Sequence, residues 1–115
     1  MAELPAKIEV GGYTYTCVED AAEILRMNAV IGISFGGICE FENARILLNP
    51  SPALSRRRVD MAHECCHAII NERHLDTLFK DETDEVFVKV FAPALVELLR
   101  RNPGLVAFLV SEAEE

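Results

Sequence analysis

The sequence predicts an α+β fold in which a small antiparallel sheet packs on one long helix and on a second helix nearer the C-terminus. Strand-like runs fill the first half of the chain, up to about residue 48, and helical periodicity fills the second half. With 115 residues, 50% of them hydrophobic, the chain can bury one compact core but not two. Residues 1–115 are therefore expected to form a single domain.

The N-terminal residues predict a hairpin followed by a short helix. Residues 8–10 and 13–18 are β-rich and flank Gly11-Gly12. Two glycines between alternating runs are typical of a tight hairpin, because a two-residue turn requires positive φ. A helix of about two turns then starts at Asp20, which is expected to cap it, with Glu23 in the capping-box position.

A second antiparallel pair is predicted after the Gly36-Gly37 break. Residues 38–41 and 45–48 are mostly apolar strand-like runs joined by the short loop 42–44. Pro50 and Pro52 then end the sheet, since two prolines so close together cannot continue a ladder of hydrogen bonds. Either strand of this pair could bind an extended substrate by strand addition if it lies at a sheet edge.

The longest helical pattern spans about residues 55–73, with Ser55 as its expected N-cap. Its predicted buried stripe contains five apolar residues: Val59, Ala62, Cys66, Ile69 and Ile70. The basic run Arg56–Arg58 at its start is interpreted as a solvated helix face.

A second helix is expected to start between residues 81 and 83 and to be kinked at Pro93, which removes a backbone donor. Asn102 is expected to cap a short terminal helix that begins at Pro103 and extends through Leu109. The predicted buried face of the second helix consists of Val88, Phe91, Ala92, Leu95, Leu98 and Leu99. The terminal helix is rich in apolar residues, which could belong to the core or to a homo-oligomer interface.

Charge and composition narrow the function classes. The net charge of −8 argues against a general nucleic-acid-binding protein, which needs a basic surface. No apolar run reaches the roughly 18–20 residues of a membrane span, and the first residues lack the features of a signal peptide. A cytoplasmic location is the resulting expectation. Cys17, Cys39, Cys65 and Cys66 form no C-x-x-C pattern and are interpreted as small buried residues.

The motif that carries chemistry is His63-Glu64-Cys65-Cys66-His67, an H-E-x-x-H stretch inside the long helix. Residues four apart share a helix face, so both imidazoles can bind one metal ion. Zinc is the expected metal, because two imidazoles and one carboxylate leave a fourth position for water. Glu64 can reach that water and is the expected general base.

A third ligand is expected from the acidic segment before the second helix. Glu85 is the first choice. It shares a helical face with Val88, Ala92 and Leu95, and this face is expected to be buried. Asp81, Glu82 and Asp84 remain alternatives. His74 is expected to be a surface residue, since it would lie about 10 Å along the helix axis from His67. The oxyanion could be stabilised by any of four residues: Tyr13, Tyr15, Arg73 and His74.

The order of these features resembles the small ImmA/IrrE-type zinc metallopeptidases of phages and other mobile elements. The resemblance covers roughly residues 8–109, with the H-E-x-x-H motif as its one specific signature. It implies a minimal zincin-like domain in which His63, His67 and a downstream glutamate, here Glu85, bind zinc and Glu64 is the base. It also implies a protein substrate such as a repressor. The sequence departs from the family at Lys89, where the family has an Asn.

Two other interpretations remain open at this stage. The chain could be an inactive zincin-fold binding module whose zinc is structural or vestigial, since 115 residues leave little room for a deep cleft. It could also be a globular protein without a metal.

Overall fold

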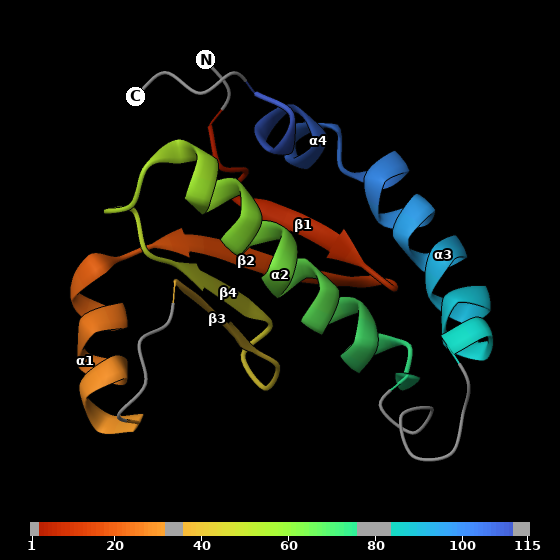
Figure 1. The fold of residues 1–115 in the computed structure, drawn as a ribbon, viewed down its shortest axis with the longest axis horizontal. Coiled ribbons are helices and arrows are strands. Elements are labelled where there is room, and N and C mark those ends of the chain that lie inside the picture. The colour runs from red at the N-terminus through yellow and green to blue at the C-terminus, as the bar shows by residue number, and fades with distance from the viewer. Residues whose placement is uncertain (1–2, 32–35, 76–83, 112–115) are drawn as a thin grey trace.

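The structure is a computed structural model that describes residues 3–31, 36–75 and 84–111. The predictions for Asp81 and Glu82 concern residues outside these ranges. Figure 1 shows the long helix α2 lying across one face of a sheet, with α3 and α4 following its length. In chain order the elements are β1 (Lys7–Val10), β2 (Tyr13–Glu19), α1 (Ala21–Ile31), β3 (Gly37–Glu40), β4 (Arg45–Leu48), α2 (Leu54–Glu72), α3 (Asp84–Arg101) and α4 (Pro103–Leu109).

The α+β class and both predicted hairpins are confirmed. β1 pairs with β2 and β3 pairs with β4, each pair antiparallel. The β1–β2 turn contains Gly11 at φ 58° and Gly12 at φ 90°, the conformation that the two glycines were expected to supply. The sheet as a whole is mixed rather than antiparallel, because β2 pairs with β4 in parallel. The crossover through α1 makes this possible, since parallel neighbours need a long connection.

The strand order β1-β2-β4-β3 decides which strands are edges. β4 lies between β2 and β3, so the alternative in which residues 45–48 bind a substrate strand is wrong. β3 is an edge of the described sheet, and α2 packs beside it.

The stripe that α2 buries shares only Ile69 with the one predicted. Val59 is 64% exposed, and Ala62, Cys66 and Ile70 are only partly buried. The residues that α2 buries are Leu54, Asp60, Met61, Glu64, Cys65, Ala68 and Ile69. The two stripes are offset by one position, and the polar residues Asp60 and Glu64 concealed the buried one. The predicted cap is also wrong: Ala53 occupies the N-cap position, and Ser55 lies inside the first turn.

The face that α3 turns to the core overlaps the predicted one only in part, at Phe91 and Leu98. Its described part is Asp84–Arg101 with Pro93 inside it as predicted, and the predicted start at residues 81–83 lies outside the described residues. Ala94 and Leu98 are buried, whereas Ala92 and Leu95 of the expected face are exposed. Phe87 and Phe91 stack with ring centroids 5.3 Å apart and pack against the core. The buried face therefore follows positions 87, 91, 94 and 98.

The short helix α4 confirms its predicted bounds and belongs to the core. Leu105 and Phe108 are 0% and 1% exposed, whereas Val110 just after the helix is 71% exposed. The main apolar residues of this segment thus stabilise the fold of one chain. Asn102 occupies the N-cap position but makes no side-chain cap hydrogen bond. Its amide instead accepts from Glu9 N and donates to Glu9 O, at 2.8 and 2.9 Å.

The basic run is only partly a solvated face. Arg57 donates to the Pro52 carbonyl and pairs with Glu19, and Arg58 donates to the Ser111 carbonyl. Both are half-buried, so for these two residues the interpretation is wrong. Elsewhere, Asp20 caps α1 as predicted, accepting from Glu23 N at 3.0 Å. Within the described ranges, no helix has the length and apolar character needed to cross a membrane.

Candidate active site

The helix α2 brings the two motif histidines together at its surface. His63 and His67 are one turn apart and exposed, and their Nε2 atoms are 3.1 Å from each other. The rings meet edge to face, with centroids 4.7 Å apart and an interplanar angle of 72°. Two nitrogens bound to one tetrahedral zinc at about 2.0–2.1 Å would be roughly 3.3 Å apart. The imidazoles therefore already have the spacing of two ligands to a common ion.

The protonation of His67 is compatible with that role. Burial lowers its pKa, and the neighbouring His63 lowers it further. An imidazole must be neutral to bind a metal, and a lowered pKa keeps it neutral at pH 7. The lowered pKa thus leaves the His67 imidazole in the form that can bind a metal.

Glu64 is held between α2 and the start of β3. Glu64 is 6% exposed, and its side chain lies directly against Gly37. A Cβ built at residue 37 would be 3.0 Å from Glu64 Cγ and 3.3 Å from Glu64 Oε2. Burial raises the pKa of Glu64, the charge of His63 opposes this rise, and Asp60 adds to it. A carboxylate with a raised pKa is a stronger base, which suits proton abstraction from water.

A cavity of about 250 Å³ opens beside the motif. It is lined by Gly37, Ile38, Cys39 and Phe41 from β3 and the following turn, and by His63, Glu64 and His67 from α2. The edge strand therefore forms one wall, and the motif helix forms the other. The sequence indicated Ile38–Phe41 as a candidate substrate strand, but it gave no sign that Cys39 would face the histidines.

The cysteines behave as buried thiols. All four are free, with Cys17 and Cys65 buried and Cys39 and Cys66 half-buried. Burial raises the pKa of the Cys39 thiol to about 12, and the charge of Glu64 acts in the same direction. Burial likewise raises the pKa of Cys66, which would oppose any role as a thiolate nucleophile at neutral pH.

All four residues predicted as a possible third metal ligand have side chains outside those that the structure describes. Glu85 and Asp84 lie in the first turn of α3, but their side chains are outside the described set, as are the residues Asp81 and Glu82. The prediction that the helical face of Glu85 is buried is wrong, because Ala92 on that face is exposed. Among the described residues, no group of three His, Cys, Asp or Glu side chains could hold a metal.

None of the four candidate oxyanion donors lines the described cavity. Tyr15 is fully buried, and its hydroxyl donates to Glu72, which removes it from consideration. Tyr13 is exposed on the β1–β2 hairpin. Arg73 forms an ion pair with Glu97 at 2.6 Å. His74 is exposed, as predicted, just after the end of α2.

Comparison with known proteins gives one match. Residues 24–95, well over half of the chain, match the family model Peptidase_M78, described as the IrrE N-terminal-like domain. The matched region contains most of α1, all of β3, β4 and α2, and the first part of α3. No curated protein and no solved structure is similar enough to the chain to count as a match.

Proposed function

Because this chain belongs to the IrrE N-terminal-like family of peptidases, we propose that it is a zinc-dependent metallopeptidase that hydrolyses peptide bonds. The observation that supports this most directly is the 3.1 Å approach of His63 Nε2 to His67 Nε2 beside a cavity walled by an edge strand. The family resemblance in the sequence further suggests a regulatory protein, such as a repressor, as the substrate.

In this proposal His63, His67 and Glu85 hold the zinc ion, with Asp81, Glu82 and Asp84 as the alternatives to Glu85. A zinc ion bound there would polarise the scissile carbonyl and acidify a water molecule. Glu64 is the general base that takes the proton from the attacking water and later delivers it to the leaving amine. Its burial against Gly37 limits its freedom, and its raised pKa favours the protonated form needed for that second step.

The substrate is proposed to bind along β3. The backbone of an edge strand can pair with an extended peptide, which gives affinity without reading the peptide sequence. Ile38 and Phe41 line the cavity beside the motif, and Phe41 is 45% exposed. This apolar lining favours an apolar substrate side chain close to the bond that is cut.

Zinc content and activity test the proposal together. Protein purified without added zinc is expected to contain about one zinc per chain, and His63→Ala or His67→Ala should abolish binding. His74→Ala is the matched control, because this histidine is exposed outside the cavity. Glu85→Gln and Asp84→Asn, measured side by side, identify the third ligand by which of them weakens zinc binding.

The alternative, an inactive binding module with a zincin fold, is separated from the enzyme by Glu64→Gln. For a peptidase, this change should leave zinc bound and remove cleavage of an unfolded test protein such as casein. For a binding module, the parent itself would show no cleavage above that of Glu64→Gln. A parent that takes up no zinc, even when zinc is supplied, would contradict both.

A further inference from the structure

The outer face of α3 carries positive charge that has no carboxylate partner among the described residues. Six arginines elsewhere have partners: Arg26 with Glu23, Arg45 with Glu40, Arg56 with Asp60, Arg57 with Glu19, Arg73 with Glu97, and Arg58 with the Ser111 carbonyl. In the part of the chain that the structure describes, Arg100 and Arg101 have no carboxylate partner. They are consecutive, both exposed, and lie in the last turn of α3.

The nearest carboxylate on this face does not neutralise them. Glu97 lies one turn before Arg101, but it is engaged by Arg73 from the end of α2, at 2.6 Å. Lys89 lies on the same outer face two turns earlier and is exposed. The face is therefore locally cationic in a chain whose net charge is −8.

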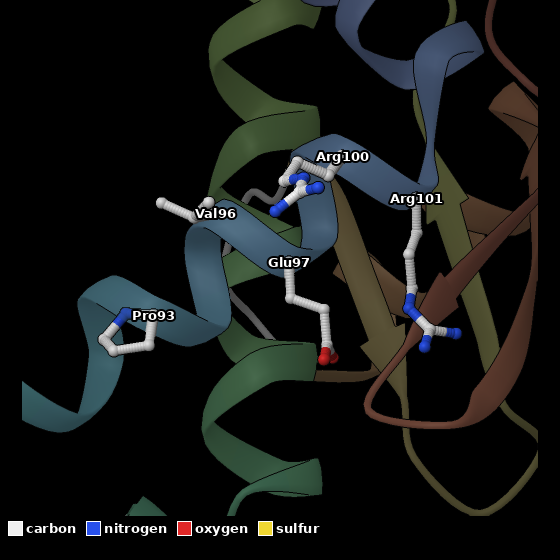
Figure 2. Close-up of a pocket in the computed structure, with 5 residues that line it drawn as sticks. All are labelled: Pro93, Val96, Glu97, Arg100 and Arg101. Carbon is white, nitrogen blue, oxygen red and sulfur yellow. The ribbon is translucent and has the colours of Figure 1, made fainter.

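Apolar surface lies beside these charges. Val96 is 52% exposed and Val90 is 41% exposed, and both follow the outer face together with Pro93. Pro93, Val96, Glu97, Arg100 and Arg101 line a cavity of about 450 Å³. Figure 2 shows these side chains following one another along α3, from Pro93 to the two arginines.

We propose that this face, defined by Lys89, Pro93, Val96, Arg100 and Arg101, binds a segment of a protein partner that carries carboxylates next to an apolar side chain. The apolar side chain would lie on Val96 and Pro93, and the carboxylates would pair with the arginine forks, which match carboxylate geometry. This surface is separate from the motif cavity, because α3 packs on α2, α4 and β1, and β1 is the sheet edge opposite β3. The proposal does not depend on zinc or on peptidase activity.

The overall charge of the chain decides which partner fits. An acidic protein segment would be repelled by the net negative charge of the chain and attracted by this face, so the face would also fix its position. A nucleic acid would meet the same global repulsion over a far longer charged backbone. We therefore favour a short acidic segment over a nucleic acid.

The test uses the intact chain and a labelled peptide, acetyl-Glu-Glu-Leu-Glu-Leu-Glu-Glu, followed by fluorescence anisotropy. The parent is expected to bind it at least about tenfold more tightly than the same peptide with Gln in place of Glu. The double variant R100Q/R101Q should weaken binding about tenfold, and Val96→Ser about threefold. K7Q/R26Q removes the same charge from other exposed positions and should change binding less than about twofold.

Three results would overturn the proposal. The first is that the parent shows no preference for the Glu peptide, or that K7Q/R26Q loses as much peptide binding as R100Q/R101Q. The second is tighter binding of a labelled oligothymidine through the same arginines, which would assign the face to nucleic acid. The third is a parent that sediments as a dimer and becomes a monomer in R100Q/R101Q, which would make the face an interface between copies. Unchanged thermal unfolding of each variant shows that a loss of binding is not a loss of fold.

Discussion

Gly37 lies so close to Glu64 that a single methyl group at residue 37 would be 3.0 Å from the glutamate Cγ. The Leu47 carbonyl oxygen is on the other side of that position, at 3.1 Å. The added atom would thus meet a backbone group and the candidate base at once. The glycine is what lets the start of β3 approach the motif helix.

Gly37→Ala is therefore expected to destabilise the protein by about 1–3 kcal/mol, the usual cost of overpacking. Chemical denaturation measures this. Gly104→Ala is the control, since its new Cβ would have only Pro5 as a neighbour, at an ordinary 3.6 Å. Equal stability of Gly37→Ala and the parent would show that Glu64 moves aside freely and is not held by β3.

Zinc affinity is expected to fall as the pH is lowered, because protons compete with zinc for the imidazoles. The loss should reach about tenfold per pH unit for each histidine that protonates. Because burial and His63 lower the pKa of His67, this histidine should stay neutral to a lower pH than an ordinary one. Competition with a chelator between about pH 8 and pH 5 measures the profile. His74→Ala should leave it unchanged, and a profile that is flat down to pH 5 would exclude histidine ligands.

Stability is expected to fall at alkaline pH because of the buried thiols. Burial raises the pKa of Cys17 to about 11, and the pKa of Cys65 is raised as well. A raised folded-state pKa stabilises the protein fully below the unfolded-state pKa of about 8.5, and this contribution is lost as pH rises toward the folded-state value. The urea concentration at the unfolding midpoint should therefore decrease as pH is raised from about 8.5 to 11. In Cys17→Ala this drop should be shallower, and an unchanged slope would count against the assignment.

Asn102 is expected to be a major stabilising contact between α4 and β1. It is 7% exposed, accepts from Glu9 N, and donates to Glu9 O and to Leu98 O. Asn102→Ala would leave these backbone groups short of partners, at a cost of about 1–3 kcal/mol. Thermal unfolding measures the loss, with Asn43→Ala in the exposed β3–β4 turn as the control. A loss no larger than that of the control would mean that water replaces the amide.

The sequence alone determined the features that depend on neighbouring residues. Positive φ at Gly11 and Gly12 fixed the first hairpin, and Pro103 fixed the start of α4. The four-residue spacing of His63 and His67 put both imidazoles on one face of a helix. These features follow from the backbone geometry of a few consecutive residues, so they could be read without knowing the rest of the fold.

The tertiary structure alone decided the features that depend on distant residues. The crossover through α1 put β4 inside the sheet and left β3 at its edge, beside the histidines. Periodicity allowed two neighbouring stripes on α2, and only packing against the sheet selected the one that buries Glu64. The same ambiguity applies to α3, where Ala92 and Leu95 on the helical face of Glu85 are exposed. A hydrophobic pattern shows that a helix has a buried face but not which neighbour that face meets. Which stripe is buried, and which edge stays open, is set by the free energy of the whole packed core rather than by any local segment.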